Sequence, residues 1–297
     1  MNVSKKEHIL LIVSMFIFGT IGLFVKYIPL SSGEIALYRA ILAIVVIGIF
    51  LFVTKSKLDF NYLKKYIPLL LLSGIAMGIN WILLFESYKY TSVSIATLSY
   101  YFAPTIVMIV STFLFKEKLT KKQIMCFIGS TIGLILITGI TNSDTNNLIG
   151  IILGLGAAIF YATVILLNKF IKGINGVNRT FLQFISSCVI LIPYVLFTSG
   201  INLFTLNVSP FIYLLIIGVI HTGLTYVMYF SSIKDLPGER IAIYSYIDPL
   251  VAILVSYVFL DETMNLTQLI GGVLILFFTL FSELKINKKW TFSFKND

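Results

Sequence analysis

Apolar residues gather in ten long runs along the chain, and the short segments between them hold most of the charged residues. A helix that spans a bilayer needs about 20 mostly apolar residues, and each run is long enough for one. The pattern therefore predicts an all-α integral membrane protein with ten transmembrane helices. The predicted spans are 8–27, 33–54, 66–88, 92–115, 122–140, 147–170, 178–199, 209–230, 239–260 and 265–284.

The composition supports this prediction and excludes several classes of protein. Of the 297 residues, 58% are hydrophobic and 12% are charged, and the mean hydropathy is +0.97. Soluble domains average about 45–50% apolar and about 25% charged residues. Ten spans occupy roughly 200 residues and leave roughly 100 for all loops and tails. This remainder is too short for a separate soluble catalytic or nucleic-acid-binding domain of typical size.

Lysine and arginine are distributed very unevenly between the two sets of loops. If the N-terminus is cytoplasmic, 19 of the 22 basic residues lie in cytoplasmic segments, and only Lys26 and Lys89 lie outside. The remaining one, Arg39, falls inside the second span. Because basic residues accumulate in cytoplasmic loops, we expect a multi-pass protein of a bacterial-type cell membrane with both termini cytoplasmic. The net charge of +9 then reflects this asymmetry and does not indicate a nucleic-acid partner.

The two halves of the chain resemble each other when the sequence is shifted by 145 residues. Nine identities fall within the 39 positions from Phe85 to Gln123. We therefore expect two five-helix repeats, 1–140 and 147–284, followed by a cytoplasmic tail, 285–297. Because five is an odd number, the second repeat enters the membrane in the opposite direction to the first. Inverted repeats are typical of transporters, whose substrate site lies near the midplane where the repeats meet.

Two sets of residues within this pattern carry a resemblance to a known family. The first set is Pro104, Glu117 and Gln123, which recur as Pro249, Glu262 and Gln268, followed by Gly271 and Gly272. The second set is Phe18–Gly19 with Lys26, and the segment from Glu34 to Arg39. Over essentially its whole length the chain resembles the EamA family of the drug/metabolite transporter superfamily. It departs from that family at Phe18, where the family often has Trp, and at Cys126 and Phe127, where the first repeat lacks the glycine that follows the glutamine.

The resemblance implies ten helices in two repeats around a central cavity walled by helices 1, 3, 4, 6, 8 and 9. It also implies transport of small organic solutes, often the export of amino acids and related metabolites.

Asp248 is the carboxylate that the sequence places nearest the middle of a span. A charge at the bilayer centre is costly, so such a residue is a candidate functional group. Tyr244 and Ser245 precede it by four and three residues, on the same helical face. One interpretation is a carboxylate that couples transport to protons or binds a substrate amine. The alternative is a structural Asp that pairs with another helix or caps the backbone groups freed by Pro249.

Two further spans carry polar candidates near their middles. In helix 8, His221 and Thr225 share one face, and the alternative for His221 is a satisfied core residue. In helix 3, Asn80 corresponds to Thr225 under the 145-residue shift and is followed by Trp81. Asn80 either lines the cavity or bonds a neighbouring helix. Because the other histidine, His8, is expected at the lipid–water boundary, no metal site is expected, and the sequence indicates no cofactor.

The remaining candidates are Ser99 and Tyr100 in helix 4 and Tyr161 in helix 6. Aromatic walls suit a cationic or aromatic solute, although most of the 25 Phe and 16 Tyr must pack or face lipid. We expect Arg39 to reach the interface or to pair with Glu34. Glu117 and Glu262 are expected to be loop anchors in water.

A secondary transporter for a small polar metabolite is the leading hypothesis, with the solute, the bilayer and possibly protons as partners. Amino acids or derivatives rank first, and quaternary amines or other organic cations second. A channel and an integral membrane enzyme are the alternatives from other classes. Neither is favoured, because inverted repeats do not supply the like-oriented symmetry of a channel, and one membrane histidine does not supply a metal cluster.

Overall fold

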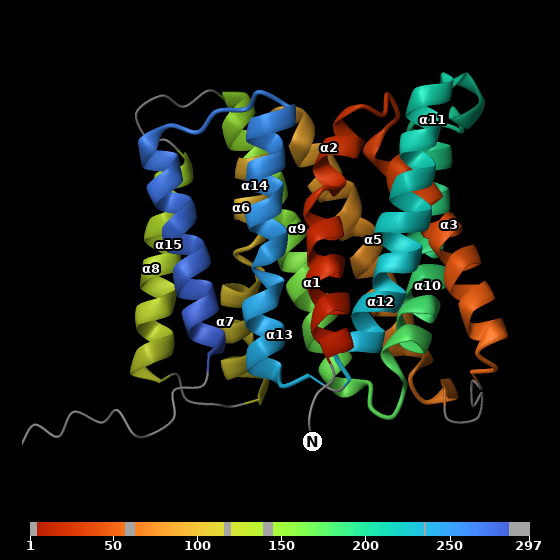
Figure 1. Cartoon of the computed structure of the whole chain (residues 1–297), viewed down its shortest axis with the longest axis horizontal. Coiled ribbons are helices and arrows are strands. Elements are labelled where there is room, and N and C mark those ends of the chain that lie inside the picture. The colour runs from red at the N-terminus through yellow and green to blue at the C-terminus, as the bar shows by residue number, and fades with distance from the viewer. Residues whose placement is uncertain (1–4, 57–62, 116–119, 139–144, 235, 285–297) are drawn as a thin grey trace, which may run out of the picture.

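A computed structural model describes residues 5–56, 63–115, 120–138, 145–234 and 236–284. Within these residues, ten helices are long and apolar enough to cross a membrane, which confirms the predicted all-α membrane fold. The predicted tail 285–297 and Glu117 lie outside the described residues. The ten spans, in chain order, are α1 with α2 (Lys5–Gly19, Ile21–Lys26), α3 (Ser32–Val53), α5 (Ile67–Tyr90), α6 with α7 (Val93–Tyr100, Ala103–Phe115), α8 (Lys121–Thr138), α9 (Thr145–Phe170), α10 (Gly176–Thr198), α11 with η2 and α12 (Val208–Leu215, Ile216–Leu224, Thr225–Ser232), α13 with α14 (Gly238–Ser245, Ile247–Phe259), and α15 (Leu266–Glu283). A short 3₁₀ turn, η1 (Leu203–Thr205), precedes α11 (Figure 1).

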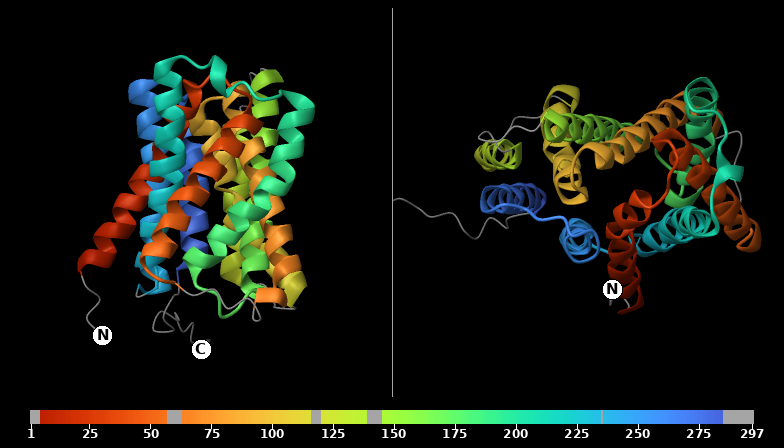
Figure 2. Two further views of the ribbon diagram at one scale, coloured as in Figure 1. Left: turned by 90° about the vertical axis from the view of Figure 1, so that its right-hand side faces the viewer. Right: turned by 90° about the horizontal axis from the view of Figure 1, so that it is seen from above.

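Helices of one repeat pack against helices of the other, and the following contacts recur when the roles of the two repeats are exchanged. The fourth and ninth spans lie against the first helix of the other repeat, as α6 with α9 and α14 with α1. The third and eighth spans also do so, as α5 with α9 and α12 with α1. The fifth and tenth spans, α8 and α15, pair with each other, as do α3 and α10. Figure 2 shows α8 and α15 at one end of the molecule and α3 and α10 toward the other, with the remaining spans between them.

Four spans are interrupted, and two of the interruptions correspond to each other. The fourth span breaks between Tyr100 and Ala103, just before Pro104, and the ninth breaks at Tyr246, just before Pro249. Proline lacks an N–H group and its ring clashes with the carbonyl one turn earlier, so each break follows from the sequence. Each break follows an eight-residue helix and lies inside a membrane-spanning segment, and broken helices are characteristic of transporter binding sites.

The glutamine shared by the two repeats begins a helix in both. The Gln123 side chain accepts a hydrogen bond from the Thr120 backbone N–H at 2.9 Å, and Gln268 accepts one from the Asn265 N–H at 3.0 Å. In return, the side chains of Thr120 and Asn265 accept bonds from the glutamine N–H groups. This reciprocal arrangement is a capping box. The repeated glutamine is therefore explained by helix initiation and not by solute binding.

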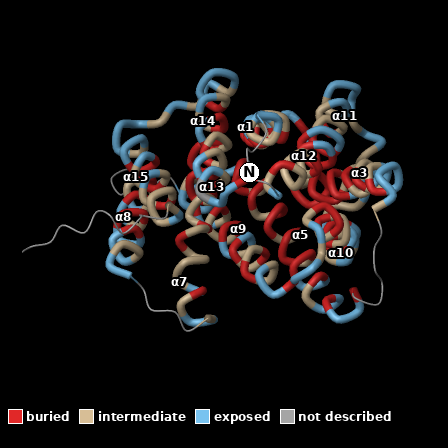
Figure 3. Tube along the Cα trace, turned by 60° about the horizontal axis from the view of Figure 1, so that its bottom comes forward, coloured by how far each residue is buried: buried red, intermediate tan, exposed pale blue. Residues whose placement is uncertain are grey.

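The faces between helices are buried, whereas the outward faces are apolar and exposed (Figure 3). Phe113 is 81% exposed and Phe197 is 89% exposed, as expected for side chains that face lipid. The pair α8 and α15 approaches most closely at Gly133 and Gly271, where a Cβ on either would lie 2.7 Å or 2.6 Å from the carbonyl oxygen of the other. Gly133 thus provides the close approach in the first repeat, although Cys126 stands where the second has Gly271.

Candidate functional site

Asp248 lies at the break of the ninth span, in the first turn of α14, and is half-buried. Its Oδ2 accepts a hydrogen bond of 2.6 Å from the Tyr101 hydroxyl, which lies at the corresponding break of the fourth span. The first turn of a helix favours a negative charge, because its backbone N–H groups are unpaired and its dipole is positive there. The two breaks therefore bring a carboxylate and a phenol together at the contact between repeats.

Further tyrosines surround this pair. The Tyr100 ring lies 6.1 Å from that of Tyr101 and 5.2 Å from that of Tyr161. Tyr161 is 39% exposed and belongs to the second repeat, as Asp248 does, whereas Tyr100 and Tyr101 belong to the first. A row of three phenols, drawn from both repeats, therefore ends at the Asp248 carboxylate.

Tyr244 and Ser245, the expected companions of Asp248, are separated from it by the break. The Ser245 hydroxyl donates to the Ile241 carbonyl of its own helix at 2.8 Å. Its carbonyl lies 3.5 Å from the Tyr101 hydroxyl, so Ser245 borders the site through its backbone. Tyr244 packs against Leu11 and Met15 of α1 and meets the His8 ring at 5.7 Å. A role for either side chain in binding stays a prediction.

His221 connects the eighth span to the break in the first span. It is 2% exposed, and its Nε2 lies 2.8 Å from the Thr20 hydroxyl between α1 and α2. Its Nδ1 lies 3.2 Å from the carbonyl of Ile216, five residues back in the π-helical turn η2. The Thr225 hydroxyl likewise donates to its own helix, to the Ile220 carbonyl at 2.7 Å. Both side chains are engaged within the protein, which matches the structural alternative for His221.

Asn80 and Ser99 hold α9 against its neighbours. The Asn80 amide donates to the Ala157 carbonyl at 2.6 Å and also interacts with Tyr100. The Ser99 hydroxyl bonds the Ile95 carbonyl at 2.9 Å, and its Cβ lies 3.0 Å from the position that a Cβ on Gly154 would occupy. Of the two, Asn80 lies beside the tyrosine cluster, whereas Ser99 lies at a close helix crossing.

Trp81 packs against the buried guanidinium of Arg39. The expectation that Arg39 reaches the interface or pairs with Glu34 is therefore wrong. Arg39 is 4% exposed; its guanidinium carbon lies 4.2 Å from the centre of the Trp81 ring, and its Nε donates to the Thr222 hydroxyl at 3.0 Å. Glu34 does not pair with it. Glu34 instead accepts from the Asn202 backbone N–H at 2.7 Å, because it caps the turn before η1.

The side of the molecule opposite the N-terminus is closed by a set of contacts that we call the Glu262 cluster. Glu262 accepts a bond of 2.7 Å from the Val93 N–H at the start of α6 and lies 3.2 Å from the Lys26 ammonium at the end of α2. The Ser256 hydroxyl also donates to it. Glu262 is therefore an anchor, as expected, but it joins three spans and is largely buried.

The N-terminal side instead contains a polar pocket of about 260 Å³, which we call the N-terminal-side pocket. It extends from Pro104 at the break of the fourth span to Lys169 and Glu283 at the ends of α9 and α15, both of which are exposed. Val107 and Ser111 line it between these limits. Under the 145-residue shift these two correspond to Ala252 and Ser256, which are buried on the closed side.

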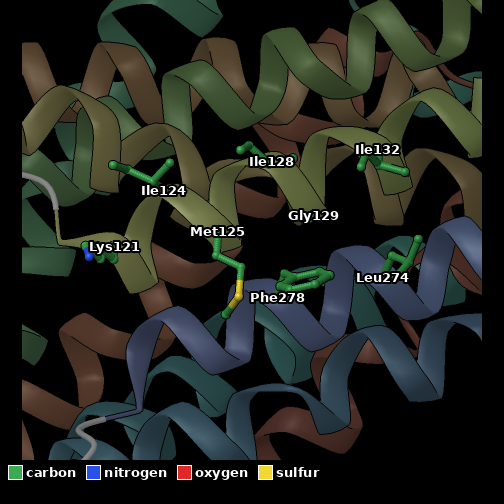
Figure 4. A pocket seen from close by; sticks show the side chains of 8 residues that line it. All are labelled: Lys121, Ile124, Met125, Ile128, Gly129, Ile132, Leu274 and Phe278. Atoms are coloured by element: carbon green, nitrogen blue, oxygen red, sulfur yellow. The ribbon is translucent and has the colours of Figure 1, made fainter. Parts of the chain in front are cut away.

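A second pocket, of about 380 Å³, is an apolar groove between α8 and α15. Figure 4 shows Met125 and Phe278 on its two walls, with Lys121 at one end. The groove exists because Gly129 has no side chain where the Phe278 ring approaches. It lies on the pair of helices farthest from α3 and α10 and contains a single charged residue, so it is unsuited to a polar solute. In the described part of the chain, no three His, Cys, Asp or Glu residues are grouped to hold a metal ion.

Sequence reasoning did not select Tyr101 or Tyr226 for the site, and it misplaced Arg39. The 145-residue shift contained a signal for Tyr101, because it pairs Tyr101 with Tyr246, two residues before Asp248. Tyr226 directly follows Thr225, but spacing within one helix did not reveal that its ring lies 5.1 Å from Phe18 of the first span. Contacts between helices depend on the rotation of each helix, which a single sequence does not specify.

Two five-helix halves that meet at broken helices define a membrane transporter fold. The model of the EamA-like transporter family matches the chain twice, over residues 5–139 and 148–283. The chain belongs to this family, which confirms the resemblance noted in the sequence.

Several relatives match over most of the chain. An "Uncharacterized transporter YxxF" of Bacillus subtilis is 33% identical over 285 residues, which cover 92% of this chain and 89% of the relative. "Protein PecM" of Dickeya dadantii is 25% identical over 256 residues, covering 84% and 82%. A solved structure described as "Crystal structure of protein" has a TM-score of 0.60 at 15% identity, covering 93% of this chain and 96% of its own, and shares the fold. Family and named transporter relatives are consistent with a protein that is not an enzyme.

Proposed function

We propose that this protein is a secondary-active transporter that carries small polar organic metabolites past Asp248 by alternating access. The observation that carries this proposal is the contact between Tyr101 and Asp248 at the two corresponding helix breaks. A carboxylate inside the membrane is retained where it binds a solute or a coupling ion. Asp248 lies at the contact between the repeats, where the fourth and ninth spans meet.

Alternating access is supported by the difference between the two sides. The Glu262 cluster closes the side opposite the N-terminus, whereas the N-terminal-side pocket reaches inward to Pro104. Exchange of the two pseudo-equivalent packings would bury Val107 and expose Ala252. With the N-terminus cytoplasmic, as the basic residues indicate, the present conformation is the one open to the cytoplasm of a bacterial-type cell.

Amino acids or their derivatives are the proposed solutes, and export is the proposed direction. Asp248 supplies a partner for an ammonium group, and the surrounding phenols supply hydrogen bonds and ring faces. The same residues favour a second candidate, the transport of quaternary amines or other organic cations. Asp248 is also the proposed coupling residue, because a carboxylate that alternates between two aqueous sides can carry protons in exchange for solute.

Counterflow in proteoliposomes tests the proposal. Purified protein is reconstituted, the vesicles are loaded with one unlabelled amino acid or amine at a time, and uptake of the labelled form is measured at several pH values. We expect saturable counterflow that Asp248→Asn abolishes or renders independent of pH. Asp261→Asn is the matched control, because Asp261 is an exposed loop residue near the same span. Conductance without saturation would contradict a carrier, and wild-type rate and pH dependence in Asp248→Asn would contradict the coupling role.

A further inference from the structure

Arg39 is a buried cation whose side chain is only partly bonded. In the described residues, the one hydrogen bond of the Arg39 side chain joins Nε to the Thr222 hydroxyl. No Asp or Glu carboxylate of the described residues lies within 4.0 Å of the guanidinium. The two Nη groups, with four N–H donors, therefore have no hydrogen-bond partner in the part of the chain that the structure describes. Lys26 and Lys89, on the side of the molecule opposite the N-terminus, differ from Arg39 because each pairs with a carboxylate, Glu262 and Glu86 respectively.

The surroundings of Arg39 fix the plane of the guanidinium and leave its edge free. Trp81 and Phe85 lie under it, with their ring centres 4.2 Å and 5.2 Å from the guanidinium carbon. Stacking on aromatic faces holds an arginine without using its N–H donors. Thr222 in turn donates to the Ile217 carbonyl at 2.8 Å, so its oxygen is oriented to accept from Nε. The group is thus positioned by the protein and still able to form two parallel bonds.

The aromatic platform under Arg39 continues to the eighth span, in the second repeat. The Trp81 ring lies 5.2 Å from that of Phe184, which in turn lies 5.2 Å from that of Tyr226. Arg39 comes from the first repeat and Asp248 from the second. Leaving a cation inside the membrane without an anion is costly, so an anion supplied from outside the protein accounts for its retention.

We propose that Arg39 binds the carboxylate of the transported solute through its two Nη groups, in a paired arrangement. The inference rests on the transport function proposed above and narrows its substrate class. Planar carboxylates match the fork of a guanidinium, and paired bonds to it are among the stronger hydrogen bonds in proteins. The solute is then one that carries a carboxylate, such as an amino acid, and organic cations without a carboxylate are excluded.

The wild-type protein provides the first test, through pairs of solutes that differ by one carboxylate. Counterflow and thermal stabilisation of the purified full chain are measured with L-leucine against 3-methylbutylamine, L-phenylalanine against phenethylamine, and L-lysine against cadaverine, and then with the remaining amino acids and their amines. We expect at least one amino acid to bind, and its amine to bind at least tenfold more weakly, which corresponds to about 1.4 kcal/mol. If no carboxylate-bearing solute binds, or if amines bind equally well, the inference is wrong.

Variants then assign the effect to Arg39. Arg39→Gln is expected to remove the preference for the amino acid over its amine, and Thr222→Val, which keeps the arginine but removes the Nε acceptor, to reduce it several-fold. Arg240→Gln is the control, since Arg240 is exposed at the N-terminal side. A purely structural role would lower stability and leave the ratio of the two affinities unchanged. If Arg39→Gln does not fold, Thr222→Val and the wild-type pairs decide, and an unchanged ratio in Thr222→Val overturns the inference.

The two proposals fail in different ways. Saturable counterflow of amines that is insensitive to Arg39→Gln would leave the transporter intact and refute the carboxylate site. Absence of counterflow by the wild-type protein for every solute would refute the transport function. A preference for carboxylate-bearing solutes in the binding measurements would then still support Arg39 as a carboxylate-binding residue.

Discussion

Removing the charge of Glu262 is expected to open the side of the protein that the Glu262 cluster closes. Glu262→Gln keeps the size of the side chain but removes the attraction to Lys26 at 3.2 Å and converts the bonds from Ser256 and the Val93 N–H into neutral ones. Exposed ion pairs contribute about 0.2–1 kcal/mol, and bonds to charged groups exceed neutral ones by a comparable amount. Because both partners are partly exposed, we take a total of about 1–2 kcal/mol.

Loss of this total of about 1–2 kcal/mol changes the ratio of the two conformations only if the Glu262 interactions are absent when the side opposite the N-terminus is open. In that case the open population rises about 5–30-fold. The assay is the labelling rate of a single cysteine at Ala252 by a membrane-impermeant thiol reagent, after Cys126 and Cys188 are replaced. Ala252 is 4% exposed, so labelling requires opening. A cysteine at Val107, in the N-terminal-side pocket, should be labelled more slowly in the same variant.

Asp261→Asn is the control for Glu262→Gln, because it removes a neighbouring charge outside the cluster and Asn tolerates the positive φ of 52° at that position. Equal labelling of the Ala252 cysteine in wild type and Glu262→Gln would refute the reasoning. It would mean that the cluster stabilises both conformations alike, since bonds kept in both states shift nothing.

Three further outcomes follow from packing and hydrogen bonding. Gly133→Val should destabilise the protein by about 1–3 kcal/mol through overpacking against α15, which a lower melting temperature would show. Gly238→Val is the control and should destabilise it far less, because no atom lies within 4 Å of the added Cβ. Tyr101→Phe leaves the Asp248 carboxylate without its phenol donor and should slow counterflow while the melting temperature changes little. An unchanged rate would contradict the place of Tyr101 in the site. His221→Gln and Thr20→Val should each lower stability by about 1 kcal/mol, less than additively together, and leave solute affinity unchanged; a large loss of affinity in either would restore His221 to the solute site.

The helices could be predicted, because their causes are local in the sequence. Each apolar run is its own signal, and Pro104 and Pro249 interrupt their helices through their own geometry. The correspondence of the two breaks followed from the internal repeat. Asp248 was identified for a similarly local reason, since a carboxylate in an apolar run is costly wherever the helix packs.

The partners of the polar residues could not be predicted, because they come from other helices. Arg39 and Glu34 are five residues apart on one helix, yet Arg39 bonds Thr222 of the eighth span and Glu34 bonds Asn202. His221 reaches Thr20, 201 residues away in sequence. Helical periodicity specifies which residues share a face, but the identity of the facing helix depends on the packing of the whole bundle.

The central claim, that solute crosses by closing one side while the other opens, is tested most directly by fixing the closed side. Cysteines replace Lys26 and Glu262 in the cysteine-free protein, and a short, reducible thiol-reactive cross-linker joins them in proteoliposomes. We predict that cross-linking abolishes counterflow, that reduction restores it, and that solute binding from the N-terminal side persists throughout. Counterflow at the full rate in the cross-linked protein would contradict alternating access between the two repeats.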